Sequence, residues 1–382
     1  MRKKISFVLI SLVVLALIGG EVLPLPVLRL FLAISVTLQS VITFALPALI
    51  FCLIFSTFQR LGKNASRIFI VALVLLCCSN FLATYMSHFI GEIIHGMDLS
   101  LVQISANKEL TPSFNFKLPK IIPNALAMVV AMICGIFVPK VAPIGAQKVS
   151  IIVDKFVSLF LKCIGFVVPF FLFGFLLKMQ YDGIVMVLIR QYVVIVAIIV
   201  VAIVSYLLLF YFLVNRMNPR ATFMAMKNMI PAVLCAFGTM SSASALPYTL
   251  TAVEKNSKNK ALAKSIVSIT TNIHLIGDCI AIPIFIYAIL KSYGMPQPSQ
   301  LLYLAFVLQF VAAKFSVAAV PAGGIIVMLP IIERCFGFNG AMSSLILSLY
   351  ILMDPICTSA NVLGNGAFAQ LIDKIATHLH SK

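Results

Sequence analysis

Long apolar runs are the feature that most restricts what this chain can fold into. The run Ile184–Leu213 alone is longer than the roughly 20 residues that a membrane-spanning helix needs. Of the 382 residues, 62% are hydrophobic and 10% charged, whereas soluble domains run near about 45–50% apolar and about 25% charged. These values exclude a water-soluble enzyme, a disordered tail and a collagen-like fibre. An outer-membrane barrel is also excluded, because its strands alternate apolar and polar residues.

Ten apolar segments follow one another along the chain. Six are expected to be helices, at about 5–25, 27–58, 68–94, 121–146, 150–178 and 184–214, and four more segments lie near 221–256, 261–291, 301–336 and 341–374. If 221–256 and 301–336 do not cross, most of the 28 Lys and Arg residues fall on one side, which the positive-inside rule assigns to the cytoplasm. We therefore predict eight crossings, both termini cytoplasmic, and an external loop at 97–120.

The net charge of +17 is explained by this topology and does not indicate a nucleic-acid partner. The basic start Arg2-Lys3-Lys4 followed by Ile5–Ile18 looks like a secretory signal, but Gly19-Gly20-Glu21-Val22 is a poor cleavage site, so we expect an uncleaved first helix. The nine cysteines lie in apolar stretches and are expected to be reduced and buried. The chain lacks a Gly-rich phosphate loop, which argues against an ATP-driven pump.

Two of the apolar segments are interrupted midway by small, polar or Pro/Gly residues. One carries Gly238–Pro247 and the other Ala318–Gly324. Irregular backbone at membrane depth is tolerated only where protein or a water-filled cavity satisfies it. A pair of interrupted segments is the sequence signature of a transporter binding site. Two ordinary helices kinked by proline are the alternative.

Acidic residues inside apolar runs are candidates for function, since a charge at the bilayer centre is costly. Asp278 and Asp354 lie well inside such runs. Thr358, Asn361 and Asn365 follow Asp354 at four, seven and eleven residues, which places all four on one helix face. This stripe predicts a polar track that faces a cavity rather than lipid.

Lys314 is a second anomaly, because it lies too far from a predicted helix end to reach the interface easily. It is expected either to pair with Glu333 or Asp354 or to act as a fixed cation in the site. The five histidines show no metal-ligand spacing with Cys or acids, apart from the terminal pair His378 and His380, which we interpret as part of a solvated tail.

The last 160 residues resemble the dicarboxylate/amino acid:cation symporters, the glutamate transporter family. Ser241-Ser242-Ala243-Ser244-Ala245-Leu246-Pro247 is similar to the serine-rich tip of the family's first re-entrant hairpin. Ala319-Val320-Pro321-Ala322-Gly323-Gly324 is similar to the G-V-P-G-x-G of the second hairpin. The stretch Asp354–Asn365 is similar to the D-x-x-R-T-x-x-N-V-x-G-D of the last helix. The order and spacing of the three match as a set.

The resemblance implies an all-α integral membrane protein with eight transmembrane helices, two re-entrant helical hairpins and inverted repeats. It implies scaffold helices 1 and 2 in 1–67, helix 3 of a transport domain in 68–96, and the external loop with scaffold helices 4 and 5 in 97–183. The rest of the transport domain would be 184–382, with helix 6, hairpin 1 at 221–256, helix 7, hairpin 2 at 301–336 and helix 8. A homotrimer is also implied, although the fourth helix region is short for the family.

The resemblance also assigns roles to site residues. Asp354 would bind a substrate amino group, Thr358 and Asn361 its carboxylate and backbone region, and Ser241 and Ser242 its carboxylate. Cys357 stands where the family has the Arg that clamps a second, side-chain carboxylate. Without that guanidinium, a small neutral amino acid is favoured over glutamate or aspartate.

The sodium sites of the family are altered in this chain. Its N-M-D-G-T aligns without gaps to His274-Leu275-Ile276-Gly277-Asp278, so the sodium-binding Asp becomes Ile276, and the Asp that closes the last-helix motif becomes Asn365. The candidate ion-binding residues are His274, Asp278, Asn361 and Asn365. Asp278 would face about 200° away from the site on a regular helix, unless the backbone is unwound there. Lys314 falls where the family has a small residue, and we hypothesise that it replaces a bound sodium.

The sequence therefore predicts a secondary active transporter, not an enzyme, for a small amino acid or a dicarboxylate. It would work by an elevator-like movement with altered or reduced sodium coupling, no cofactor, and Na⁺ or H⁺ left open as coupling ion. Three alternatives remain: a sodium:dicarboxylate or glutamate symporter with rebuilt ion sites, an anion channel, and an intramembrane aspartyl protease, for which two facing carboxylates would be needed.

Overall fold

The described part of the protein is helical throughout. The computed structural model describes residues 15, 19–20, 22–63, 67–97, 110–119, 122, 124–142, 145, 148–149, 151–153, 155–156, 159, 163, 170, 173–174, 176–178, 180–317 and 322–380. No strand occurs among these residues, as the all-α prediction requires. Most of the predicted first helix, much of the predicted helix 150–178, residues 98–109 of the predicted external loop and the 318–321 part of the second hairpin motif lie outside them.

The long helices follow the predicted apolar runs closely. The elements are α2 (Leu25–Lys63), α3 (Arg67–Gly96), α4 (Asn124–Val141), α6 (Ile184–Val214), α7 (Pro219–Thr239), α8 (Ser242–Asn256), α9 (Lys260–Thr270), α10 (Ile276–Ser292), α11 (Gln300–Ala313), the 3₁₀ turn η1 (Lys314–Ser316), α12 (Gly323–Phe336) and α13 (Gly340–His380). The predicted run 261–291 is not one helix, since it is broken between α9 and α10. Residues 110–119 carry no helix.

Four helices in the described part are long and apolar enough to cross a membrane. They span Ile70–Gly96, Tyr192–Val214, Pro219–Thr239 and Gly340–Thr377. On α6 the large side chains of Val201, Val204 and Leu208 are exposed. Apolar side chains on the outside of a helix this hydrophobic are expected to face lipid. The protein is thus built for more than one passage through a bilayer.

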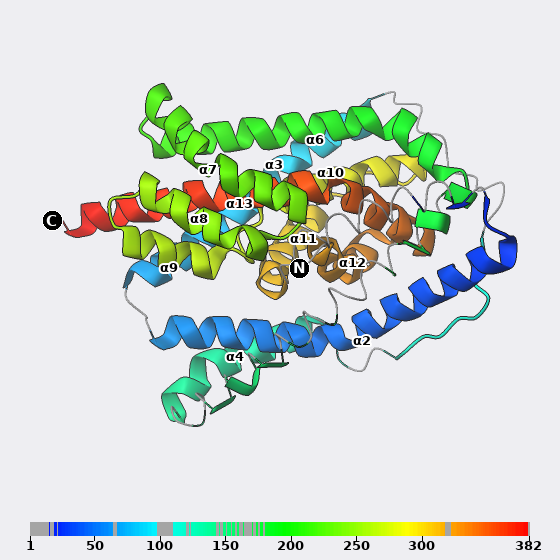
Figure 1. The fold of residues 1–382 in the computed structure, drawn as a ribbon, viewed down its shortest axis with the longest axis horizontal. Helices are drawn as coiled ribbons and strands as arrows, with labels where there is room; N and C mark the ends of the chain where they lie inside the picture. The colour runs from blue at the N-terminus through cyan, green and yellow to red at the C-terminus, as the bar shows by residue number, and fades with distance from the viewer. Residues whose placement is uncertain are drawn as a thin grey trace.

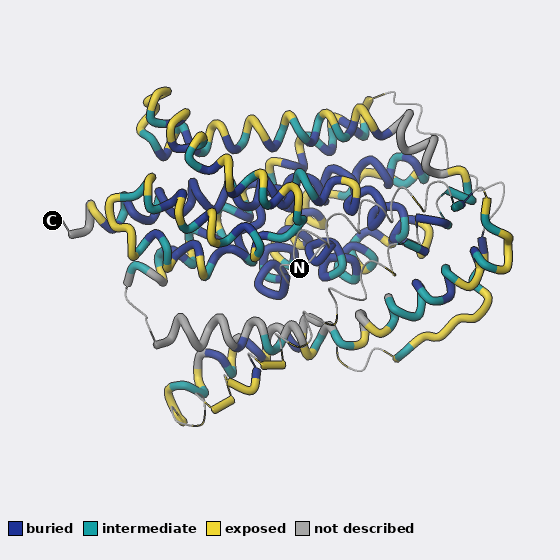
Figure 2. Tube along the Cα trace, in the orientation of Figure 1, coloured by how far each residue is buried: buried dark blue, intermediate teal, exposed yellow. Residues whose placement is uncertain are grey.

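The helices fall into two groups in space (Figure 1). The helices α2 and α4 pack against each other along the lower side of the view, while α3 and α6 to α13 form the larger body above them. Buried residues gather along α10 and α13, which run through the middle of that body (Figure 2). Sixteen of the 17 residues of α10 are buried, so α10 is the centre around which the larger body packs.

Two helix pairs end inside the larger body. The α7–α8 pair turns at Met240, whose φ of 49° is left-handed, and Ser241 caps α8 by accepting a hydrogen bond from the Ser244 amide. The second pair joins α11 through η1 to α12, whose N-cap Ala322 also has a left-handed φ of 58°. Non-glycine residues in this region cost about 1–2 kcal/mol each. The surrounding contacts must therefore hold both turns in place.

The chain leaves the helical path at residues 271–275, between α9 and α10, and some backbone groups there, such as the Ile273 carbonyl and the Leu275 amide, are paired with side chains of other helices. Asn80 of α3 supplies two partners: its amide nitrogen donates to the Ile273 carbonyl at 2.8 Å and its oxygen accepts from the Leu275 amide at 3.3 Å. Asn365 of α13 donates to the His274 carbonyl at 3.1 Å. Buried peptide groups need such partners, and here asparagines on two helices provide them.

We predict that Asn80→Ala lowers stability markedly. The substitution leaves one buried carbonyl and one buried amide unpaired, at a cost of about 1–3 kcal/mol for each lost partner. The apparent Tm of the purified protein in detergent measures this loss. Ser265→Ala is the matched control, because its exposed hydroxyl only bonds a carbonyl of its own helix. Equal Tm values for the two variants would contradict the role given to Asn80.

Candidate binding site at the broken helices

A small polar cavity lies where the two helix pairs, the α9–α10 break and α13 meet. Its volume is about 20 Å³, which is room for about one water molecule. The lining residues come from five parts of the chain. They are Met240 and Ser242; Thr271, Asn272, Leu275 and Asp278; Val317; Gly324; and Tyr350, Asp354, Thr358 and Asn361. The predicted stripe on α13 thus faces a cavity over three of its four members.

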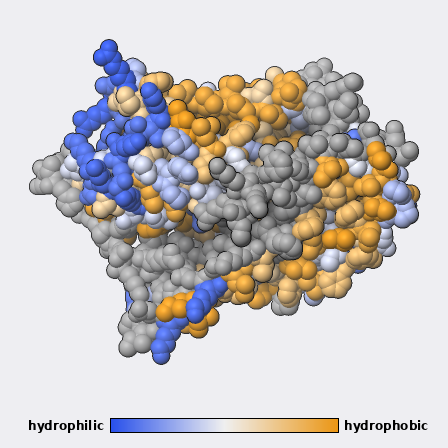
Figure 3. Space-filling view, in the orientation of Figure 1, coloured by the Kyte–Doolittle hydropathy of each residue, from blue (hydrophilic) through white to orange (hydrophobic). Residues whose placement is uncertain are grey.

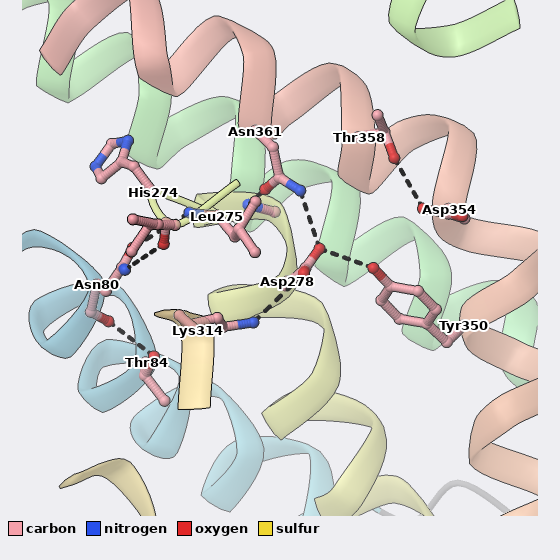
Figure 4. Close-up of polar contacts among 12 residues, drawn as sticks. Asn80, Thr84, His274, Leu275, Asp278, Lys314, Tyr350, Asp354, Thr358 and Asn361 are labelled. Carbon is pink, nitrogen blue, oxygen red and sulfur yellow. Dashed lines mark hydrogen bonds and ion pairs between the residues drawn. The ribbon is translucent and has the colours of Figure 1, made fainter. Parts of the chain in front are cut away.

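Asp354 is buried, and both of its carboxylate oxygens accept hydrogen bonds. Thr358, one turn later on α13, donates to Oδ1 at 2.8 Å (Figure 4). The backbone amide of Ala322, at the start of α12, donates to Oδ2 at 2.8 Å. The positive end of a helix favours a carboxylate at this position. Asp354 therefore connects the backbone at the start of α12 to the lining of the cavity by a hydrogen bond.

Asp278 is the second carboxylate of the cavity, and it is also buried. Its Oδ1 accepts hydrogen bonds from Tyr350 at 2.9 Å and from the Asn361 amide at 3.0 Å, and its Oδ2 faces the ammonium of Lys314 at 3.4 Å (Figure 4). A Cβ on Gly324 would lie 2.4 Å from Oδ2, so only glycine allows α12 to approach this closely. The backbone is not helical at residues 271–275, just before α10, and Asp278 lines the cavity.

Lys314 is buried completely, although it is a lysine. Its ammonium lies 3.4 Å from Asp278 Oδ2 and 4.1 Å from the centre of the Phe310 ring. The expected partners were Glu333 or Asp354, and the structure pairs Lys314 with neither of them. Glu333 instead accepts a hydrogen bond from Ser343. The partner was missed because the break that aims Asp278 at Lys314 was not predicted as such.

Of the other predicted substrate residues, one lines the cavity and two do not. Ser242 lines the cavity, whereas Ser241 lies beside it as the cap of α8. Cys357 is buried but does not line the cavity. The backbone of Cys357 packs directly on Gly277, where a Cβ would come within 2.4 Å of the Cys357 carbonyl oxygen. The backbone of Cys357 therefore packs against the first turn of α10.

The predicted ion-binding residues form two groups. Asp278 and Asn361 meet in the cavity, and the Gly277 amide also donates to Asn361 Oδ1 at 2.8 Å. Asn365 binds the Thr270 hydroxyl and the broken backbone instead, and His274 bonds Ser79 through Nε2 at 2.9 Å. The described residues contain no group of three His, Cys, Asp or Glu that could hold a metal ion.

The sequence did not predict the lining residues Thr271, Asn272, Val317 and Tyr350, nor Asn80, which supports the site from α3. Tyr350 lies four residues before Asp354 and so extends the α13 stripe by one turn, a signal that was present in the spacing. Asn80 had a weaker signal, as an amide beside Ser79 in an apolar helix. Its partners are almost 200 residues away in the chain, and no local pattern identifies them.

The cavity, which has room for about one water molecule as described, is lined by groups whose chemistry suits a cation. Asp278 and Lys314 offset each other's charge, which leaves the Asp354 carboxylate as the negative charge lining the cavity without an ion-pair partner among the described side chains. Thr358, Ser242 and Tyr350, which carry hydroxyl groups, also line the cavity. An ammonium group facing a buried carboxylate gains a charge-assisted hydrogen bond.

Comparison with known proteins identifies the family. The sequence profile of the sodium:dicarboxylate symporter family matches residues 5–375. Excitatory amino acid transporter 1 of Rattus norvegicus is 24% identical over 266 residues, which cover 67% of this chain and 48% of the rat protein. Neutral amino acid transporter B(0) of Homo sapiens is 27% identical over 179 residues, or 46% of this chain and 31% of the human protein.

The aligned regions span about half the length or less of these curated relatives. The family profile nevertheless covers nearly all of this chain. The chain therefore belongs to the sodium:dicarboxylate symporter family, a family of transporters and not of enzymes. The family and the apolar helices together make it a multi-pass membrane protein.

We predict that Lys314→Met destabilises the protein strongly and that adding Asp278→Asn restores much of the loss. Removing one partner of a buried ion pair costs about 3–5 kcal/mol, because the other charge remains buried and unpaired. The apparent Tm in detergent measures both variants, and Lys227→Met, at an exposed position, is the control. A Lys314→Met protein as stable as the wild type would show that the pair is not structural.

Proposed function

We propose that this member of the sodium:dicarboxylate symporter family is a secondary active transporter of a small amino acid. It would act in the inner or plasma membrane, with a neutral amino acid favoured over a dicarboxylate. One observation carries the proposal: the Asp354 carboxylate is fixed by Thr358 and by the Ala322 amide in a polar cavity between two interrupted helix pairs. That is the geometry expected of a transporter site at the middle of the membrane.

The choice of a neutral amino acid rests on the cations near the cavity. Cys357 stands in place of the family's arginine, so no guanidinium is present there to clamp a second carboxylate. Lys314, the other candidate cation, is already paired with Asp278. Among the relatives, the rat protein is named for excitatory and the human protein for neutral amino acids, and the charges described here favour the second type.

We propose further that sodium coupling is altered or reduced. The Lys314 ammonium lies next to Asp278 Oδ2, where it supplies the positive charge that a bound cation would otherwise supply. A buried carboxylate needs such a compensating charge. The tethered ammonium cannot leave with the substrate, so it would not couple transport to a sodium gradient at this position.

The arrangement of the helices supports an elevator-like movement. The proposed transport domain combines 68–96 with 184–382, and in Figure 1 α3 lies with α6 to α13 while α2 and α4 lie apart. The scaffold would be 1–67 and 97–183. We propose eight transmembrane helices, two re-entrant hairpins at 221–256 and 301–336, inverted repeats, and both termini in the cytoplasm, on the grounds of the charge count and the family.

A homotrimer is proposed on the family resemblance. The helix α4 carries Leu126, Val130, Ile133 and Phe137 exposed on one face. Residues spaced in this way form a continuous apolar stripe on a helix. A stripe on the proposed scaffold is suited to contact a second copy, and mass measurement of the purified protein in detergent tests the trimer.

We predict that a small neutral amino acid raises the apparent Tm of the purified protein equally in sodium and in choline. A ligand that binds only the native state stabilises it by mass action. The panel comprises neutral amino acids, aspartate, glutamate and dicarboxylates, each in sodium, potassium or choline at two pH values. Stabilisation by aspartate or a dicarboxylate only in sodium would overturn the proposal in favour of a symporter with rebuilt ion sites.

We predict that Asp354→Asn removes this ligand-induced shift and lowers uptake into proteoliposomes by about 10-fold or more. The loss of a hydrogen bond to a charged group costs about 1.5–3 kcal/mol, which corresponds to about 10- to 100-fold in affinity. Glu254→Gln is the control, because Glu254 pairs with Lys264 away from the cavity. Unchanged uptake by Asp354→Asn would exclude Asp354 as the substrate partner. A steady current without saturable uptake in the wild type would instead indicate a channel.

A further inference from the structure

A second hollow, remote from the cavity described above, lies at the end of the larger body where α6, α8 and α13 end. Its volume is about 580 Å³, and basic side chains dominate its lining: Arg216, Lys255, Lys258 and Lys374. Figure 3 shows hydrophilic surface gathered at this end of the molecule, next to a largely apolar surface along the helices. The proposed transport function does not use this hollow.

The positive charge of the hollow is not balanced by its lining. Asp373 is its acidic lining residue, and both oxygens of that carboxylate accept hydrogen bonds at 2.8 Å from the Lys258 and Asn259 amides. With four basic side chains and one carboxylate, the lining has a net charge of about +3. Like charges held close together repel, so an anion in the hollow would relieve this repulsion.

Part of this charge is held in place by the backbone. The Lys374 ammonium donates to the Val214 carbonyl and, at 3.3 Å, to Asn215 Oδ1. Arg216 follows in a left-handed conformation, with a φ of 54°, and Met217 has a φ of 60°. Such conformations cost about 1–2 kcal/mol each for residues other than glycine. The α6–α7 loop is therefore held in a strained form that places Arg216 beside Lys374.

The hollow also contains a hydroxyl whose hydrogen bonds are not satisfied. Ser257 lines it, and the buried Ser257 Oγ has no hydrogen-bond partner among the described residues. Buried polar atoms normally have partners. Arginine and lysine side chains together with a hydroxyl donor are groups from which phosphate oxygens accept strong hydrogen bonds.

The position of the hollow relative to the bilayer identifies the source of the phosphate. The candidate span on α6 ends at Val214 and the one on α7 begins at Pro219, and Arg216, which lies between them, lines the hollow. It therefore lies at headgroup depth, on the side that the charge count predicts to be cytoplasmic. Basic pockets at this depth bind anionic lipid headgroups.

We propose that this hollow binds a phosphate group, that of an anionic phospholipid in the adjoining leaflet. The Arg216 guanidinium would form a bidentate hydrogen-bonded contact with the phosphate. Lys255 and Lys258 would add positive charge, and the Ser257 hydroxyl would donate a hydrogen bond. Bound there, the headgroup links the α6–α7 loop, the α8–α9 loop and the end of α13. Lipid composition then sets the stability of this end of the protein.

The test compares lipids and a matched pair of variants. The purified protein in a neutral detergent receives phosphatidylglycerol, phosphatidylcholine or inorganic phosphate, and the apparent Tm is measured at low and high salt. The variant is Arg216→Gln with Lys258→Gln, and the control is Lys227→Gln, at an exposed position on α7 outside the hollow. If the first variant does not fold, Lys255→Gln with Lys258→Gln replaces it, since both positions are exposed.

We expect phosphatidylglycerol to raise the Tm of the wild type and of the control more than phosphatidylcholine does, with a smaller effect at high salt. At least half of this difference should be lost in the double variant. Equal effects of the two lipids, or a double variant that keeps the full difference, would overturn the proposal. A shift produced by inorganic phosphate and not by phosphatidylglycerol would assign the hollow to a soluble phosphate and overturn the lipid assignment.

Discussion

The need to satisfy broken backbone in an apolar interior is the constraint on which the rest of the site depends. Residues 271–275 leave the helix between α9 and α10, in surroundings where an unpaired peptide group would be costly. Asn80 from α3 and Asn361 and Asn365 from α13 supply the partners. A side-chain amide is suited to this work because it offers both a donor and an acceptor. Three helices are thereby fixed relative to one another before any ligand is considered.

The break also determines where the charges point. With the Gly277 amide bonded to Asn361, the first turn of α10 places the Asp278 carboxylate where Tyr350 and Lys314 both contact it. Gly324 allows α12 to begin against the same carboxylate. An unbroken helix would turn Asp278 away and leave Lys314 buried without a counter-charge, which would be strongly unfavourable. The break, the glycine and the ion pair therefore depend on one another.

The sequence predicted those parts of the site that lie close together in the chain. The α13 stripe follows from helical spacing, and the range of α6 follows from its apolar run. Contacts between distant segments were not accessible in this way. The Lys314–Asp278 pair depends on where α10 begins, and the sequence left the direction of Asp278 open, because that direction depends on where the backbone is unwound. Asn80 was missed for the same reason, since its partners are defined only by the packing of α3 against the break.

The charged residues that differ from the family motif at this site balance one another. The resemblance places two family carboxylates at Ile276 and Asn365, and both are neutral here. A buried carboxylate without a cation is costly, so a chain that lost sodium at these positions would be expected to lose the carboxylates as well. Asp278 adds one negative charge and Lys314 balances it within 3.4 Å. The region then needs no added cation to be neutral, except at Asp354, where the charge that is left can be met by an ammonium group of the substrate.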